Sequence, residues 1–307
     1  MIAIVYKSTG SRYLVKNEEG KEYSVRLKGK FKIDAITSTN PIAVGDVVNI
    51  ENEEDFESTI ITEIFERKNY INRISPHNKN QHHIVASNLD QSLLFATIKE
   101  PRTSLGFIDR FLITSEAYQV PAIIVFNKID LLNKKDEEQF QKTKAMYEKI
   151  GYKILAVSLH NKSGVDTIIE VLKNKTTLLS GHSGVGKSTF INELFPELKL
   201  KTQDVSNWSG KGLHTTTFAE MFDLPQQGKI IDTPGIREMG LVNMTKYELA
   251  HYFPEMRALL NQCQFNNCIH INEPGCAIKN GVNEGLIDEN RYNSYLNILD
   301  SLQTKTY

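Results

Sequence analysis

The stretch that decides the fold is Gly181-His182-Ser183-Gly184-Val185-Gly186-Lys187-Ser188-Thr189. It matches the phosphate-loop pattern GxxxxGK[ST] at every fixed position. An apolar run at 177–180 precedes it and a helical pattern at 190–195 follows it. Glycines let backbone N–H groups curl around a polyphosphate, and the start of a helix adds positive potential. The alternative, a Gly/Ser loop before a helix, is disfavoured because pattern and context are both satisfied. The sequence therefore predicts that these residues bind a nucleoside triphosphate.

Two side chains of this loop have chemical roles in the pattern. Lys187 would reach the β and γ phosphates, which makes it a catalytic as well as a binding candidate. Ser188 would place its hydroxyl on Mg²⁺.

A base-reading motif, Asn127-Lys128-Ile129-Asp130, follows an apolar run that predicts a buried strand. Guanine offers two donors, N1–H and N2–H₂, and the carboxylate of Asp130 can accept from both. Adenine has no proton on N1 and would leave that carboxylate unpaired, so the site would strongly discriminate against adenine nucleotides. Asn127 would hold the base and its loop, the stem of Lys128 would cover the purine ring, and Ser158 would help to close the pocket. The pattern thus favours GTP over ATP.

The γ-phosphate would be sensed by a second set of residues. Asp232-Thr233-Pro234-Gly235 follows another short strand pattern. Asp232 would hold Mg²⁺ through water, and the Gly235 N–H would contact the γ-phosphate. One of the three threonines at 215–217 would meet the same Mg²⁺, and we favour Thr216.

Two features depart from ordinary GTPases. The base-reading motif precedes the phosphate loop, whereas it usually follows it, and a circular permutation accounts for this order because sheet pairing does not depend on chain order. In addition, Ile236 occupies the place where small GTPases carry a water-orienting glutamine. Intrinsic hydrolysis should therefore be slow unless another group assists.

Secondary-structure patterns divide the chain into three parts. Residues 1–67 contain several short β-type runs between turn signals, which predict a small β-barrel, with an OB-fold as the leading candidate and a purely structural β-module as the alternative. Residues 67–83 are polar and predict a linker. From 92 to 231, β-type runs alternate with helical patterns at 106–118, 136–150 and 165–172, which predicts an α/β fold with a parallel sheet covered on both faces.

The C-terminal part contains a candidate metal site. Cys263-x₄-Cys268-x-His270-x₅-Cys276 supplies three thiols and an imidazole, and no cysteine lies elsewhere. Zn²⁺ takes four such ligands tetrahedrally, and a filled set leaves no open position for catalysis. We expect one structural zinc that staples a short helical segment. The alternative is a set of free cysteines near a surface histidine.

Bulk composition is that of a globular protein of two or three domains. The chain has 307 residues, 40% of them apolar, and a net charge of −1, which argues against a strongly nucleic-acid-binding molecule. No uncharged apolar run approaches the roughly 18 residues that span a bilayer, so we expect no membrane association. Residues 1–6 predict a first strand and not a signal peptide. We therefore expect a cytoplasmic protein.

Taken in order, these motifs resemble the ribosome small subunit-dependent GTPase A family (RsgA, also called YjeQ). The resemblance spans the chain and includes Gly212-Leu213-His214-Thr215-Thr216-Thr217 and Asp232-Thr233-Pro234-Gly235-Ile236-Arg237. It implies an N-terminal OB-fold (1–68), a circularly permuted GTPase domain (69–243) and a zinc-binding helical domain (244–307). It also implies a GTPase of late small-subunit assembly that is stimulated by the subunit. Its partners would be that subunit, its rRNA and assembly factors on it, and the protein would be a monomer.

The resemblance also implies that His214 is catalytic. Leu213, before it, departs from the Arg or Lys often found there, which puts one basic contact in doubt. The preceding segment, 196–213, contains several lysines and Trp208, which suit contact with rRNA. Two other functions stay open: a passive RNA-binding module with GTP as a structural ligand, and a permuted GTPase that acts on the large subunit.

Overall fold

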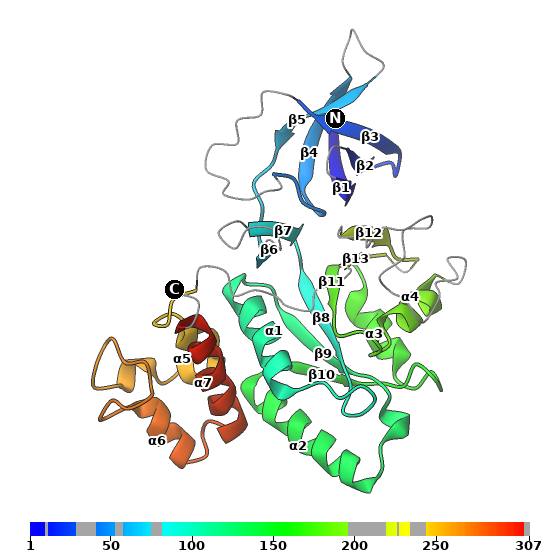
Figure 1. Cartoon of the computed structure of the whole chain (residues 1–307). Helices are drawn as coiled ribbons and strands as arrows, with labels where there is room; N and C mark the ends of the chain where they lie inside the picture. Colours follow the sequence, from blue (N-terminus) through cyan, green and yellow to red (C-terminus); the bar gives the residue numbers. More distant parts are fainter. Residues whose placement is uncertain are drawn as a thin grey trace.

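The computed structural model describes residues 1–9, 12–28, 41–52, 58–74, 82–195, 219–225, 227–233 and 244–303. Figure 1 shows a β-barrel, a central α/β sheet and a helical C-terminal part beside helix α1. The segment 196–213 and the candidate residues His214, Thr216, Gly235 and Ile236 lie outside the described residues.

The N-terminal barrel is built from five strands: β1 (Ile2–Ser8), β2 (Tyr13–Asn17), β3 (Glu22–Leu27), β4 (Val47–Asn52) and β5 (Thr59–Ile64). Hydrogen bonding runs β1–β2–β3–β5–β4 and closes through a β4–β1 pairing; only β3 and β5 are parallel. Alternate side chains fill the interior, among them Val5, Val15 and Ile61, all fully buried. A closed five-stranded barrel confirms the expected OB-fold.

The sequence predicts a linker over residues 67–83, but part of this polar stretch forms a β-hairpin. Strand β6 (Tyr70–Ile74) pairs antiparallel with β7 (His82–Ser87). The reason is a small apolar face: Ile71 and its partner Ala86 are buried in the main core, and Tyr70 packs on Tyr118 with ring centroids 5.5 Å apart. Tertiary burial of these few side chains outweighs the polar composition around them.

The central sheet carries the predicted alternation. Its strands are β8 (Gln91–Ala96), β9 (Ala122–Phe126), β10 (Lys153–Ala156), β11 (Thr176–Ser180), β12 (Glu220–Asp223) and β13 (Lys229–Asp232). The order is β10-β9-β8-β11-β13-β12, and all neighbours are parallel except β12 and β13. Strand β12 then meets β1 at Lys7 and Glu220, so the barrel and the α/β sheet form one continuous sheet.

Helices cover both faces of this sheet, as predicted. Helices α1 (Leu105–Ala117) and α2 (Lys134–Ile150) bury side chains such as Phe111 and Phe140 in one core cluster. Helices α3 (Val165–Leu172) and α4 (Lys187–Leu194) pack against the other face through Ile168 and Phe190. Because β8, β9, β10, β11 and β13 run in one direction, the loops at their carboxyl ends gather at one edge.

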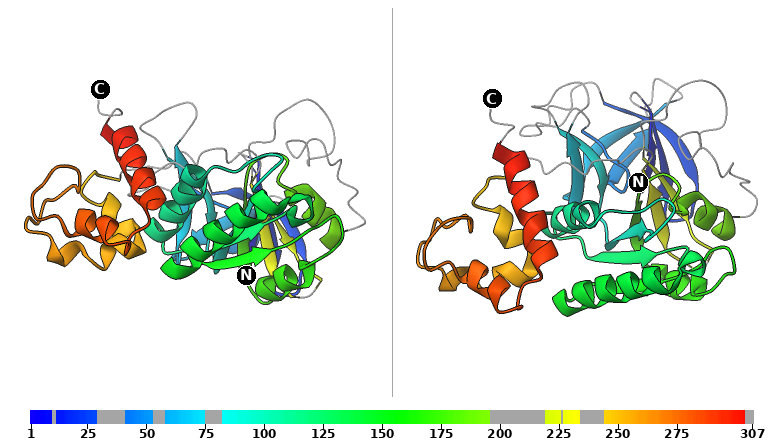
Figure 2. Two further views of the ribbon diagram at one scale, coloured as in Figure 1. Left: turned by 90° about the horizontal axis from the view of Figure 1, so that it is seen from below. Right: turned by 60° about the horizontal axis from the view of Figure 1, so that its bottom comes forward.

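The C-terminal part contains short helical segments and one long helix. The short segments are η4 (Leu249–Tyr252), α5 (Pro254–Arg257), η5 (Leu260–Gln262) and α6 (Ala277–Asn283), and the long helix is α7 (Glu289–Gln303). Their core includes Phe253, Met256 and Tyr295 and is shared with Ile113 of α1. Figure 2 shows these elements, coloured yellow to red, at the side of the sheet and away from the barrel. None of the helices that the structure describes has both the length and the apolar composition to span a bilayer.

Candidate nucleotide site and metal centre

A cavity of about 450 Å³ lies at the carboxyl edge of the central sheet. The base-reading motif, the phosphate loop and the loop after β10 all contribute to its lining: Asn127, Lys128, Asp130, Leu131, Leu159, His160, Gly184, Gly186, Lys187, Ser188 and Thr189. The fold thus brings together two motifs that lie far apart in the sequence.

Asn127 joins the two motifs physically. Its Nδ2 donates to the Val185 carbonyl at 2.9 Å, and its Oδ1 accepts from the Leu159 N–H at 3.1 Å. Gly186 has a φ of +107°, and a Cβ placed there would lie 2.2 Å from Asn127 Nδ2. Glycine is therefore required at 186 both by the backbone conformation and by the approach of the amide.

The rest of the base-reading motif forms one wall of the cavity. Lys128 adopts a left-handed conformation, with φ of 64°, and its Nζ donates to the Glu100 carbonyl at 2.5 Å. Asp130 lines the cavity, and its Oδ2 lies 4.0 Å from Nδ1 of His160. Ile129 is not among the lining residues; its N–H donates to the Val157 carbonyl.

Ser158 is also not among the lining residues. Its side chain is buried, and its Oγ accepts from the Asn161 N–H at 3.3 Å. The next two residues, Leu159 and His160, line the cavity instead, together with Leu131. Sequence analysis did not single out these three. The available signal was that each follows a strand or motif at the same sheet edge.

The phosphate loop places Lys187 in a buried position. Its Nζ donates to the carbonyls of Gly181 and His182, the latter at 2.8 Å. Burial lowers the pKa of Lys187 to about 8, although the nearby Asp232 carboxylate acts in the opposite direction. His182 packs on Phe107 of α1, with ring centroids 3.7 Å apart. Thr189 and Gly184 face the cavity, whereas Ser183 is exposed and lies outside its lining.

The side chains of Ser188 and Asp232 have buried oxygen atoms without a hydrogen-bond partner in the part of the chain that the structure describes: Ser188 Oγ and both carboxylate oxygens of Asp232. Burial raises the pKa of Asp232 to about 6, and the charge of Lys187 partly offsets this. Buried polar atoms of this kind are normally paired. The Ser188 hydroxyl lies in the first turn of α4, and the Asp232 carboxylate lies at the end of β13, the strand beside β11. A hydroxyl and a carboxylate suit a hydrated Mg²⁺, so these residues fit that ion.

A second cluster lies in the C-terminal part. The ligand atoms of Cys263, Cys268, His270 and Cys276 all lie within 4.8 Å of one another. Nδ1 of His270 is 3.7 Å from the Cys263 sulfur and 3.4 Å from the Cys276 sulfur. A tetrahedron with bonds of about 2.0–2.3 Å has edges of roughly 3.3–3.8 Å. The donor set can therefore hold a metal ion and suits Zn²⁺.

Surrounding groups hold the loop that carries His270. The carboxylate of Glu273 accepts from the N–H groups of Ile269, Ile271 and Asn272 at 2.8–3.1 Å. From α7, the Tyr292 hydroxyl donates to the His270 carbonyl at 2.6 Å. Such outer contacts orient metal ligands.

Comparison with known proteins agrees with this geometry. A family model described as "RsgA GTPase" matches residues 64–242, and one described as "RsgA N-terminal domain" matches residues 4–60. A protein from Flavobacterium psychrophilum named "Small ribosomal subunit biogenesis GTPase RsgA" is 51% identical over 98% of this chain and 93% of its own length. A protein of the same name from Bacteroides fragilis is 47% identical over 100% of this chain and 99% of its own length.

Two solved structures share the fold. YjeQ from Thermotoga maritima has a TM-score of 0.79 at 31% identity, covering 98% of each chain. YloQ, described as a circularly permuted GTPase, has a TM-score of 0.75 at 27% identity, covering 100% of this chain and 96% of its own. Because both the barrel and the nucleotide-binding part match family models, this chain belongs to the RsgA family of circularly permuted GTPases.

Proposed function

We propose that this GTP-hydrolysing enzyme acts in late assembly of the small ribosomal subunit, converting GTP to GDP and phosphate under stimulation by that subunit. The observation that carries the proposal is that the base-reading motif and the phosphate loop line one and the same cavity. The relatives named for small-subunit biogenesis support the biological setting.

In this proposal, Asp130 selects guanine and Asn127 orders the site. The Asp130 carboxylate accepts from guanine N1–H and N2–H₂, while Lys128 covers the purine ring. Both polar groups of the Asn127 side chain are already hydrogen-bonded, to the backbone of Val185 and of Leu159. The role of Asn127 is therefore to hold the phosphate loop in position against the base-reading loop. Ile129 and Ser158 contribute through their backbone positions.

The phosphates would lie along the loop 181–189. Lys187 exchanges its two carbonyl contacts for β- and γ-phosphate oxygens and stabilises the charge that develops during transfer. Ser188, Asp232 and Thr216 would be the residues that hold Mg²⁺. When bound, the ion neutralises charge on the β- and γ-phosphates. Gly235 would sense the γ-phosphate, and His214 would align the attacking water.

Cys263, Cys268, His270 and Cys276 would hold one Zn²⁺ with a structural role. Four protein ligands complete a tetrahedral shell, so no position remains for a substrate. The metal would order residues 263–276, which form neither a helix nor a strand in the structure.

The partners in this proposal are the small subunit, its rRNA and assembly factors bound to it, met by a cytoplasmic monomer. GTP turnover measured with no subunit, with small subunits and with large subunits tests the proposal. Marked stimulation by small subunits alone is expected. Equal turnover in all three reactions would favour a passive RNA-binding module. Stimulation by large subunits would instead indicate a GTPase that acts on the large subunit.

A further inference from the structure

Three charged residues form a row across the junction between the barrel and the α/β sheet. Lys7 of β1 lies opposite Glu220 of β12, and Glu220 lies opposite Asp232 of β13. Both strand pairs are antiparallel, and residues opposite one another in such pairs share one face of the sheet, with Cβ atoms about 4.5–5.5 Å apart. Nζ of Lys7 donates to the Glu220 carboxylate at 2.9 Å. The row therefore leads from a barrel side chain to the Asp232 carboxylate, which fits a Mg²⁺ ion.

The row lies beside the phosphate loop. Strand β12 begins at Glu220 and β13 ends at Asp232, so both carboxylates lie at the edge of the sheet where β11 leads into that loop. Asp232 is 2% exposed, and the side chains of Lys7 and Glu220 are each 26% exposed. Charges that are buried or partly buried are screened much less by salt than exposed ones. In agreement, burial raises the pKa of Asp232 to about 6, and the Glu220 charge adds to this rise.

Glu220 and Lys7 have opposite effects on the charge at this edge. The Glu220 carboxylate adds negative charge beside Asp232, and the Lys7 ammonium neutralises part of it. Because Coulomb attraction grows with the opposing charge, a divalent cation at Asp232 would be held more tightly with Glu220 ionised and less tightly with Lys7 present. The charge balance of the ion site thus depends on a residue of the barrel.

The other end of β12 is attached to the barrel without facing the ion site. Asp223 accepts hydrogen bonds from the Tyr6 hydroxyl at 2.5 Å and from Nζ of Lys16 at 3.1 Å. Its partner in the strand pair is Lys229, at the opposite end of β13 from Asp232. The attachment of β12 to the barrel and the charge at the ion site can therefore be separated by mutation.

We propose that Glu220 is a positioning residue for the Mg²⁺ ion of the nucleotide site, that it acts through its charge beside Asp232 and does not ligate the ion, and that Lys7 of the barrel limits this effect. This inference rests on the proposed function, because it takes GTP and Mg²⁺ as the ligands of the site. It gives the barrel a direct influence on metal affinity. In the alternative, the Lys7–Glu220 pair only attaches the barrel to the sheet.

The test uses the full-length protein and a fluorescent, non-hydrolysable GTP analogue at mildly alkaline pH, so that Asp232 is ionised. Mg²⁺ is titrated, and the slowing of analogue dissociation gives the apparent Kd of the ion. Glu220→Gln should weaken Mg²⁺ binding about tenfold, which corresponds to about 1.4 kcal/mol. Lys7→Met should instead strengthen it, whereas Lys7→Arg keeps the charge and should match wild type.

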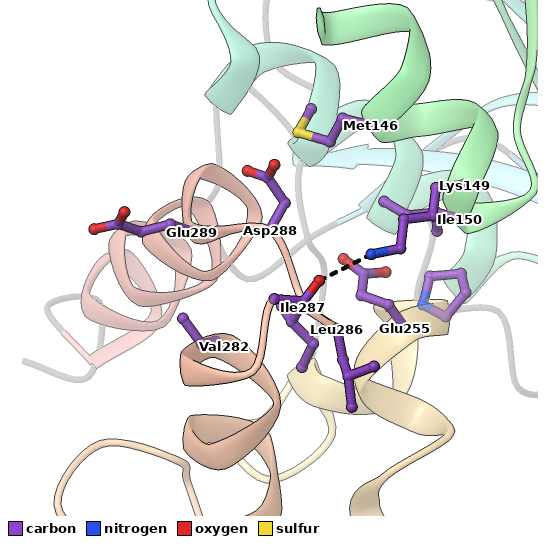
Figure 3. Close-up of a pocket in the computed structure, with 11 residues that line it drawn as sticks. Met146, Lys149, Ile150, Glu255, Val282, Leu286, Ile287, Asp288 and Glu289 are labelled. Carbon is purple, nitrogen blue, oxygen red and sulfur yellow. Dashed lines mark hydrogen bonds between the residues drawn. The ribbon is translucent and has the colours of Figure 1, made fainter.

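Two control variants remove contacts that lie outside the row. Asp223→Asn weakens the attachment of β12 to the barrel. Lys149→Met removes the hydrogen bond at 2.9 Å from Lys149 to the Gly285 carbonyl, which joins α2 to the C-terminal part beside a cavity of about 400 Å³ (Figure 3). Neither variant changes the charge opposite Asp232, so both should keep the wild-type Kd for Mg²⁺.

The exchanged pair, Lys7→Glu with Glu220→Lys, distinguishes the proposal from the alternative. It can form the same ion pair, so urea unfolding should show a stability close to wild type. Mg²⁺ binding should nevertheless be weaker than in Glu220→Gln, because an ammonium would lie opposite Asp232.

Three results would overturn the inference: wild-type Mg²⁺ affinity in the exchanged variant, shifts of the same sign in Lys7→Met and Glu220→Gln, or a tenfold loss in Asp223→Asn. If the exchanged variant does not fold, the signs of the shifts in the two single variants decide. Analogue binding by the wild-type protein that does not depend on Mg²⁺ would instead count against the proposed function.

Discussion

The side-chain amide of Asn127 donates to the carbonyl of Val185 at 2.9 Å, across 58 residues of sequence. This hydrogen bond fastens the loop that reads the base to the loop that holds the phosphates. Gly186 lies under the same amide, so the two motifs depend on each other's backbone.

Gly186→Ala should therefore disrupt nucleotide binding without unfolding the protein. A Cβ at 186 would lie 2.2 Å from Asn127 Nδ2 and would require a strained φ of +107°. We expect a roughly 5- to 150-fold loss of GTP affinity, because strain of this kind costs about 1–3 kcal/mol. Isothermal titration calorimetry measures it.

Gly151→Ala is the matched control, since Gly151 has a φ of +106° but nothing within 4 Å of its Cβ position. It should lower stability modestly and leave GTP affinity intact. Equal losses of affinity in both variants would show that the Asn127 contact is unimportant.

Asp130→Asn should exchange guanine for xanthine specificity. The amide presents a donor where the xanthine C2 carbonyl needs one, and guanine loses the acceptor for its N1–H and N2–H₂. Competition binding with GTP and xanthosine triphosphate measures the change. If the variant bound GTP as tightly as wild type, Asp130 would not contact the base.

One zinc ion should be present per chain, and its removal should unfold the C-terminal part locally. Native mass spectrometry gives the metal content, and hydrogen exchange after chelation should show lost protection in 263–276 but not in the barrel. Cys276→Ser should behave like the chelated protein, because a buried ligand is lost. A metal-free protein with normal protection there would contradict a structural zinc.

Arg291→Met should destabilise the contact between α1 and the C-terminal helices by about 3–5 kcal/mol, because it leaves Asp109 and Glu255 as buried, unpaired carboxylates. Urea unfolding measures this. Arg257→Met is the control: Arg257 pairs with Glu116 at 3.2 Å but is 52% exposed, so about 1 kcal/mol or less is expected. Similar losses in both variants would mean that burial does not govern the strength of these pairs.

His214→Ala should abolish subunit-stimulated turnover while GTP affinity and subunit binding stay nearly unchanged. Ile236 cannot orient water, so an imidazole next to the threonines at 215–217 is the proposed substitute. Steady-state phosphate release with and without small subunits measures the effect. If the variant were still stimulated to the wild-type rate, another group would have to align the attacking water.

The sequence by itself determined the features that depend on local chemistry. Glycines at 181 and 186 need positive φ, strands and helices follow their apolar periods, and four metal-ligating side chains lie within one short segment. These properties depend only on residue type and spacing. For this reason the barrel, the covered parallel sheet and the order of motifs could be predicted.

Tertiary structure alone decided which distant groups meet. Hairpin β6–β7 forms because Ile71 and Ala86 are buried in one shared core. Arg291 is buried because α1 and α5 bring Asp109 and Glu255 to it. Leu159 and His160 line the nucleotide cavity, whereas the predicted Ser158 is buried, because its backbone pairs with Ser163 in a β-bridge. Contacts of this kind depend on packing between segments far apart in the chain, and no local pattern encodes them.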